Sequence, residues 1–264
     1  MNIKMILSQT VKNSLGLSVI IITKDEEFEI QACLESISGF VDEIIVVDSG
    51  SKDRTLEICK KYTQKIFHND WKGYSDQKQF ALGKTQGPWV LNIDADERVS
   101  PALQNEITES LQGEQKNLVN GFLIPFNHYF LGKKLRFGGV RGEKHVRLFK
   151  KEMATYGNEK IHEGIQVTSP LGQLKNAIDH FSYRNLEEYL KKCNLYTSLI
   201  AEKKFSQGKR FSMFHHLRLP YEFFIRYFIK LGFLDGEKGL TYALLSSYYG
   251  WLKYMKLRDW EGKK

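Results

Sequence analysis

The sequence predicts an α/β fold with a doubly wound parallel sheet in the part of the chain up to about Asp96. Three short apolar runs, at residues 17–23, 43–48 and 89–94, are rich in β-branched side chains. Runs of this kind are typical of strands that are buried on both faces, as in a parallel sheet. Apolar residues recur at helical spacing across residues 26–38, between the first two runs. This alternation of strands and helices indicates βαβ units.

Beyond Gly121 the pattern changes to strands joined by Gly-rich loops, and after Asn185 it becomes helical. We expect strands at residues 122–126, 144–149 and 165–168, and helices at residues 186–205, 220–231 and 240–255. The sequence therefore predicts two parts, an α/β domain over residues 1–183 and a helical region over residues 184–264.

The charge of the protein is concentrated in its last third. The chain has 264 residues and a formal net charge of +8, from 39 Lys and Arg and 31 Asp and Glu. Residues 1–172 hold 22 basic and 22 acidic side chains, so residues 173–264 hold the other 17 basic and 9 acidic ones and carry the whole +8. The same segment holds 19 of the 34 aromatic side chains. Such a composition favours an anionic membrane surface or nucleic acid as partner.

Several classes of protein are disfavoured. With 42% hydrophobic residues the chain is not disordered, and three widely spaced cysteines predict neither a disulfide framework nor a structural zinc site. The N-terminus lacks the apolar region of a secretory signal. The uncharged run at residues 239–252 is shorter than the roughly 20 residues of a spanning helix, so we expect no membrane span.

Polar clusters follow the predicted strands. The first strand ends in Thr23-Lys24-Asp25, the second in Asp48-Ser49-Gly50-Ser51 and the third in Asp94-Ala95-Asp96. Ligands of open α/β sheets bind at the carboxyl ends of the strands, so we expect these clusters to converge on one crevice. Two carboxylates one residue apart at the end of a buried strand predict a Mg or Mn site that faces phosphate oxygens.

The series Leu17–Glu27, Val41–Thr55 and Asp94–Glu97 resembles the family 2 glycosyltransferases of the GT-A fold. The resemblance continues through Val146–Phe149, His162-Glu163, His180–Tyr183 and Gly232–Gly236, a fuller series that is similar to bacterial lipopolysaccharide inner-core β-1,4-glucosyltransferases. It implies a GT-A catalytic domain, which is a Rossmann-like nucleotide-diphosphosugar transferase domain, over residues 1–183.

The resemblance also implies roles for single residues. The nucleotide-sugar would be bound by residues that include Asp48, which would accept a hydrogen bond from the base; the full set is Thr23, Asp25, Glu26, Asp48, Lys78 and Asp94. Lys78 is followed by Gln79, where the family usually has Asn. Asp94 and Asp96 would hold the divalent cation that neutralises the departing diphosphate. His180 is either a further metal ligand or a structural histidine.

An inverting transfer needs a carboxylate that takes the proton of the acceptor hydroxyl. Glu163 stands at the position that the family uses for this base, and Glu143 and Asp179 are the alternatives. His162 would orient Glu163 or the acceptor. Arg147 would pair with a substrate phosphate or with a surface acid.

The basic, aromatic segment 220–231 has two further interpretations. Phe224, Tyr227, Phe228 and Leu231 lie on one predicted helix face beside Arg226 and Lys230, as in a helix that lies on anionic lipid. The same aromatic side chains could instead pack on the catalytic domain. No recognised nucleic-acid motif accompanies the charge, so we expect no nucleic acid partner.

Taken together, the sequence predicts an inverting, metal-dependent hexosyltransferase that moves glucose from UDP-glucose to a heptose of the lipopolysaccharide inner core. We expect it to be peripheral on the cytoplasmic face of the bacterial inner membrane. One alternative is a glycosyltransferase for another lipid-linked or capsular acceptor. An alternative of another class is a non-catalytic membrane or nucleic-acid binding module on a nucleotide-binding fold.

Overall fold

A computed structural model of the chain describes residues 14–157 and 164–262, and its contacts divide these into two compact units. The first unit contains residues 14–95, 99–124, 146–157 and 164–176. The second contains residues 96–98, 125–145 and 177–262. Each is described by itself below.

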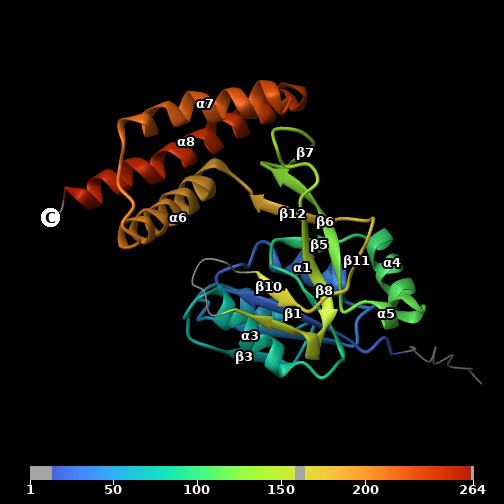
Figure 1. Cartoon of the computed structure of the whole chain (residues 1–264). Helices are drawn as coiled ribbons and strands as arrows, with labels where there is room; N and C mark the ends of the chain where they lie inside the picture. Colours follow the sequence, from blue (N-terminus) through green and yellow to red (C-terminus); the bar gives the residue numbers. More distant parts are fainter. Residues whose placement is uncertain (1–13, 158–163, 263–264) are drawn as a thin grey trace, which may run out of the picture. The chain divides into compact units, whose positions relative to one another are not determined.

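The first unit is built on a mainly parallel sheet with the strand order β3-β2-β1-β4-β8 (Figure 1). The strands are β1 (Leu17–Thr23), β2 (Glu43–Asp48), β3 (Ile66–His68), β4 (Trp89–Asn92) and β8 (Lys144–Lys150). β1, β2, β3 and β4 run parallel, and β8 is antiparallel to β4. The predicted doubly wound sheet is therefore confirmed. β4 ends at Asn92, so Asp94 lies in the turn that follows and not in the strand.

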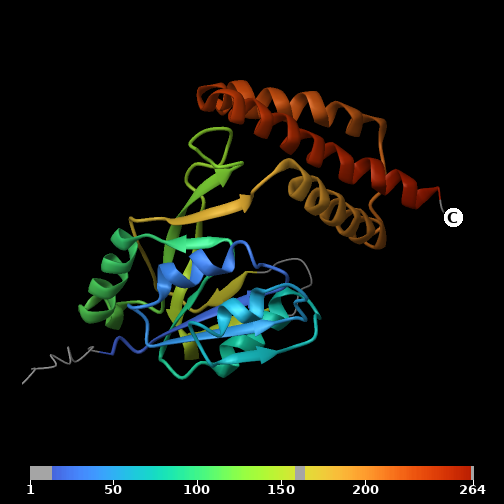
Figure 2. The same cartoon turned by 180° about the vertical axis from the view of Figure 1, so that it is seen from behind.

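Helices cover both faces of this sheet. The long helices are α1 (Ile30–Ile37), α3 (Tyr74–Lys84) and α4 (Pro101–Gln112), and the short ones are α2 (Thr55–Cys59) and α5 (Gln115–Leu118). Ala81 and Leu82 of α3 pack with Ile20 and Ile45 in one core cluster. Neighbouring strand residues point to the opposite face, which α1 covers with its own buried side chains (Figure 2). Right-handed crossovers, the general rule for parallel strands, place helices on opposite faces where the direction of strand order reverses, as it does between β3 and β4.

Short elements complete the first unit. They are β9 (Ala154–Tyr156), β10 (Ile165–Val167), β11 (Leu171–Gln173) and the 3₁₀ turn η1 (Lys151–Met153). β9 and β10 form an antiparallel pair. β5 (Glu97–Val99) and β6 (Gly121–Phe130) each have residues in both units.

The second unit contains three long helical elements, α6 (Leu186–Ser206), α7 (Arg218–Phe224) and α8 (Gly236–Glu261). α8 packs against both α6 and α7 and lies between them in Figures 1 and 2. The shorter elements are β7 (Lys133–Leu135), β12 (Ile178–Tyr183) and the turns η2 (Met213–Leu217), η3 (Ile225–Ile229) and η4 (Gly232–Asp235). The predicted helical C-terminal region is confirmed. The expected helix over 220–231 is interrupted, because η3 is a π-helical turn.

The start of α8 is packed very closely against η4. A Cβ atom on Gly239 would lie 2.0 Å from the Gly232 carbonyl oxygen. Asp235, between them, is buried, and its Oδ2 accepts hydrogen bonds from the backbone N–H groups of Arg136 and Phe137, both at 2.9 Å. This carboxylate therefore attaches the loop after β7 to the helical region.

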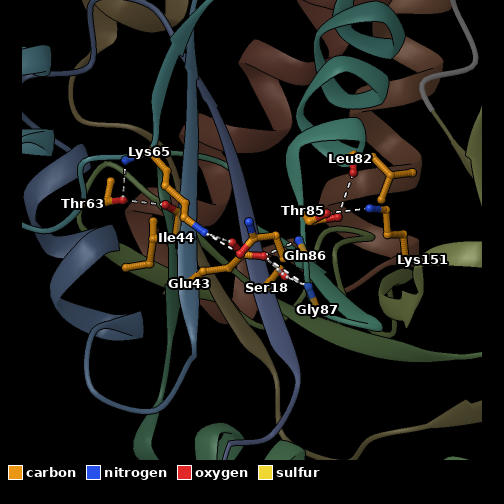
Figure 3. A network of polar contacts seen from close by, with 10 residues as sticks. All are labelled: Ser18, Glu43, Ile44, Thr63, Lys65, Leu82, Thr85, Gln86, Gly87 and Lys151. Carbon is orange, nitrogen blue, oxygen red and sulfur yellow. Dashed lines mark hydrogen bonds and ion pairs between the residues drawn. The ribbon is translucent and has the colours of Figure 1, made fainter.

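A polar network joins β1 and β2 to the segment before β3 and the segment after α3, at the amino ends of the two strands (Figure 3). Glu43 accepts hydrogen bonds from Ser18, from Lys65 and from the backbone N–H of Gln86, the last at 2.6 Å. Burial would raise the pKa of Glu43, but these donors outweigh it and lower that pKa below 4.5. The network stabilises the end of the sheet that is remote from the polar clusters.

No helix within the described ranges is long and apolar enough to cross a membrane.

We predict that Glu43→Gln lowers the free energy of unfolding by about 1–2 kcal/mol at pH 7, because charge-assisted hydrogen bonds are replaced by weaker neutral ones. The folded-state pKa of Glu43 is lowered, so its stabilisation is present above pH 4.5 and is lost as the pH falls toward the folded-state value. Urea unfolding at pH 7 and at acidic pH measures both effects. Glu57→Gln, on the exposed side of α2, is the control. Equal stability of wild type and Glu43→Gln at pH 7 would contradict the assignment.

Candidate active site

The loop after β1 is attached to the loop after β2. Asp25 has a positive φ of 55°, and its backbone N–H donates to Ser51 Oγ at 2.9 Å. In return, Lys52 N–H donates to Asp25 Oδ1 at 2.7 Å. The backbone N–H of Glu26 donates to Thr55 Oγ1 at 2.8 Å. These bonds fix Asp25 and Glu26 at the carboxyl ends of the two strands.

Asp48 ends β2 and is almost fully buried. Its Oδ2 accepts hydrogen bonds from the N–H groups of Gly50 and Ser51, at 2.8 and 2.9 Å. The carboxylate therefore holds the backbone of the loop that follows β2 in place. Thr23, opposite Asp48 in the parallel register, is also buried, and its Oγ1 has no hydrogen-bond partner among the described residues.

Asp94 forms ion pairs with Lys78 and Arg147. Its Oδ1 lies 2.9 Å from Lys78 Nζ on α3, and its Oδ2 lies 2.9 Å from Arg147 Nη2 on β8. Lys78 and Arg147 keep only 7% and 11% of their side-chain exposure, whereas Asp94 keeps 31%. Burial alone would raise the pKa of Asp94, but the Arg147 guanidinium and the Lys78 ammonium hold it well below its ordinary 3.8.

Gln79, which follows Lys78, points to another part of the first unit. Its Oε1 accepts a hydrogen bond from the backbone N–H of Tyr156 on β9 at 2.9 Å. The Tyr156 hydroxyl is buried and has no hydrogen-bond partner within residues 14–157 and 164–262. Tyr156 was not predicted as a site residue. No local motif marks it, because its neighbours come from α3 and β8 through the fold.

In the second unit, Asp96 pairs with His180. His180 Nε2 on β12 lies 3.4 Å from Asp96 Oδ2, and the N–H of Phe181 donates to the Asp96 carbonyl oxygen at 2.8 Å. One carboxylate and one imidazole are a suitable partial ligand set for Mg or Mn, which usually take their remaining ligands from water and substrate phosphates. No group of three metal-ligating side chains occurs in the described parts of the chain.

The second unit also contains a cluster of two histidines and one glutamate that was not predicted. His128 and His145 each lie 2.7 Å from an oxygen of Glu143 through Nε2. Hydrogen bonds from His128 and His145 hold the pKa of Glu143 well below 4.5. A carboxylate with so low a pKa accepts protons poorly, which disfavours Glu143 as the base. Asp179, the other alternative, accepts a hydrogen bond from Asn127 Nδ2 at 2.7 Å.

The proposed base Glu163 and its neighbour His162 lie outside the residues that the structure describes.

Comparison with known proteins identifies the family. The profile of glycosyl transferase family 2 matches residues 18–170, more than half of the chain. The chain belongs to this family. Its GT-A fold and glycosyltransferase class, both predicted from the sequence, are confirmed.

Relatives of this family 2 member match most of its length. The chain is 31% identical over 248 residues to the lipopolysaccharide core biosynthesis glycosyltransferase LpsC of Rhizobium meliloti, covering 88% of this chain and 91% of the relative. It is also 31% identical over 253 residues to an uncharacterized glycosyltransferase of Rickettsia typhi, covering 92% of this chain and 87% of the relative. The crystal structure of S. aureus TarS 1-349 in complex with UDP-GlcNAc is similar with a TM-score of 0.49 and 15% identity, covering 94% of this chain and 92% of that one.

We predict strong energetic coupling between Lys78 and Asp94 in this glycosyltransferase. Asp94→Asn and Lys78→Met should each lower the free energy of unfolding by about 2 kcal/mol, because the first removes the carboxylate that two poorly solvated cations share and the second removes one of the two cations that hold this carboxylate ionised. The double variant should lose much less than the sum of the two. Urea unfolding of the four proteins measures the coupling.

The control cycle uses Glu187→Gln and Lys191→Met, an ion pair on α6 in which both side chains are 76% exposed. We expect no measurable coupling there. Additive losses at Lys78 and Asp94 would contradict the ion-pair geometry.

Proposed function

We propose that the protein transfers a hexose, namely glucose from UDP-glucose, with inversion, to a heptose of the lipopolysaccharide inner core. The observation that carries the proposal is the ion-pair cluster of Asp94, Lys78 and Arg147 at the carboxyl edge of the sheet. The lipopolysaccharide acceptor is supported by the name of the Rhizobium relative.

The donor site is proposed to lie where the first, second and fourth strands end. Thr23, Asp25, Glu26 and Asp48 would bind the nucleoside, the first of them through its buried hydroxyl. Lys78 and Arg147 bring two positive charges against the single negative charge of Asp94. Two cations at this edge of the sheet attract a diphosphate, and their low exposure strengthens that attraction.

A divalent cation, Mg or Mn, is proposed to be held by Asp96, with Asp94 and His180 as further ligands. Asp96 and His180 already contact one another, whereas Asp94 is engaged by two cations. We therefore assign Asp96 the larger share of metal binding and Asp94 the larger share of positioning Lys78 and Arg147. When bound, the cation neutralises charge on the leaving diphosphate.

In the proposed reaction, the acceptor hydroxyl oxygen forms a bond to the anomeric carbon as the bond to the UDP oxygen breaks. Glu163 takes the hydroxyl proton, and His162 orients Glu163 or the acceptor. Glu143 is less suitable as the base, because His128 and His145 hold its pKa low.

The proposal includes a place in the cell. Residues 1–183 would form the catalytic domain, and the basic, aromatic residues 184–264 would hold the enzyme on the cytoplasmic face of the bacterial inner membrane. A lipid-anchored acceptor is found at such a surface. The distribution of charge supports this division, because residues 173–264 carry the whole net charge of +8.

The donor is tested with a panel of UDP-sugars, each with and without Mn, against purified lipopolysaccharide core acceptors. Mass spectrometry should show one added hexose with UDP-glucose and none after chelation of the metal. If glucose is transferred only to another lipid-linked or capsular acceptor, that acceptor replaces the lipopolysaccharide core in the proposed reaction. Absence of transfer and of donor hydrolysis with every sugar would contradict an enzymatic role.

The proposed residues are tested by two substitutions. Asp96→Ala should lower metal-dependent kcat about a hundredfold or more, since the metal contributes several kcal/mol of transition-state stabilisation. Glu163→Gln should lower kcat by about 10²–10⁴-fold with little change in UDP affinity. The controls are Asp259→Ala and Glu152→Gln, which change exposed carboxylates elsewhere. Native rates for Asp96→Ala or Glu163→Gln would exclude that residue from its role.

A further inference from the structure

The helical segment η2–α7–η3 exposes a continuous row of large apolar side chains. Phe214, Leu217, Tyr221, Phe224 and Phe228 follow one another at spacings of three and four, which place them along one helix face. They are 81%, 61%, 64%, 52% and 48% exposed. We call these five residues the apolar stripe. A row of this kind is ordinarily the face that a soluble protein buries.

The opposite face of the same segment carries the charges, and it is turned toward α8. Arg218, Glu222 and Arg226 are spaced four apart, and Glu222 forms ion pairs with both arginines, at 3.0 and 3.7 Å. Their guanidinium groups lie over the rings of Tyr254 and Tyr242 on α8, at 5.5 and 5.8 Å. These charged side chains are 21–39% exposed, less than every member of the apolar stripe. The usual distribution of polar and apolar side chains is thus reversed.

A basic loop packs against the end of this segment. We define it as residues 136–144, from the end of β7 to the first residue of β8. Gly138 N–H donates to the Lys230 carbonyl oxygen at 2.8 Å, and Arg226 donates to the Gly138 carbonyl oxygen at 3.2 Å. Gly139 lacks the Cβ that would lie 2.7 Å from Lys230 Cδ, so the lysine side chain can lie across the loop.

The cations of the basic loop face solvent. Arg136, Arg141 and Lys144 are exposed, and none of them forms a salt bridge within residues 14–157 and 164–262. The one acid of the loop, Glu143, is already paired with His128 and His145. The loop therefore presents positive charge that the described protein does not neutralise, beside exposed apolar side chains.

We propose that the apolar stripe inserts into the interfacial layer of an anionic phospholipid bilayer while Arg136 and Arg141 of the basic loop contact its phosphate headgroups. This inference deepens the proposed peripheral location and rests on it. It moves the contact from the predicted face of residues 220–231 to a longer row that begins at Phe214, and it removes Arg226 from the lipid-facing cations.

Charge complementarity favours a lipid surface over a second copy of this chain. Two basic loops would repel one another in a symmetric pair, whereas an anionic bilayer supplies both the apolar layer for the stripe and the negative charge for the loop. A helix that lies in the plane of the interface needs one apolar face and nearby cations, which are the two features found here.

The test is cosedimentation of the full chain with phosphatidylcholine vesicles, with and without phosphatidylglycerol. Wild type should bind the anionic vesicles, and Leu217→Ser/Phe224→Ser should bind about tenfold more weakly at any salt concentration. Arg136→Glu/Arg141→Glu should lose the preference for phosphatidylglycerol and most of its salt dependence, while retaining weak binding through the stripe.

Matched controls separate the surface from general effects. Leu118→Ser/Met153→Ser removes exposed apolar side chains of the first unit, and Lys60→Glu/Lys61→Glu reverses exposed charges there; both should bind as wild type does. Circular dichroism and UDP-glucose hydrolysis in the absence of vesicles report on folding and on the donor site. If wild type does not hydrolyse UDP-glucose, the proposed activity is refuted, whereas the proposed lipid surface is judged by the vesicle binding alone.

Two results would overturn the inference. In the first, Leu217→Ser/Phe224→Ser binds anionic vesicles as tightly as wild type. In the second, light scattering shows that wild type is a dimer in solution that Leu217→Ser/Phe224→Ser dissociates, so that a second copy covers the stripe.

Discussion

The candidate site depends on the pairing of Asp94 with Lys78 and Arg147. These residues come from the turn after β4, from α3 and from β8, so the ion pairs connect three segments that are distant in the chain. Each cation has lost most of its contact with water, and each therefore requires the carboxylate. The same two cations also attract an anionic ligand. Stability of the fold and affinity for a diphosphate thus have a common origin.

The sheet separates two kinds of polar group. At its amino end Glu43 accepts several hydrogen bonds, including those from the side chains of Lys65 and Ser18. At its carboxyl end the buried Thr23 hydroxyl has no hydrogen-bond partner among the residues that the structure describes, and Asp94 stays partly exposed. A satisfied network suits a structural role, whereas polar groups with remaining capacity suit ligand binding. The difference in hydrogen bonding, more than residue type, distinguishes the two ends.

The sequence was sufficient to predict the main elements of the fold, because buried strands and amphipathic helices leave periodic patterns in the chain. It also placed Thr23 and Asp48 at strand ends, whereas Asp94 lies in the turn after β4. It could not predict that Asp94 is held by Lys78 and Arg147, since no local pattern connects positions 78, 94 and 147. The His128–Glu143–His145 cluster was missed for the same reason.

The C-terminal region shows a different limit of prediction from sequence. Helical spacing correctly indicated that aromatic residues share a face, but spacing alone does not say whether that face is covered. Arg218 and Arg226, in the charged row with Glu222, pack on tyrosines of α8. This packing depends on the position of α8 in the folded unit, which the spacing of residues in the segment does not reveal. The π-helical turn at Ile225–Ile229 likewise has no sequence signature that we recognise.

The close approach of Gly239 to Gly232 has a consequence for how such chains vary. No side chain fits at position 239, and the buried Asp235 between the two glycines fixes the loop after β7. A change at any of these three positions would disturb the loop and the helices together. A chimera between related chains should therefore exchange residues 131–145 and 213–262 as one block, because backbone hydrogen bonds join the two segments.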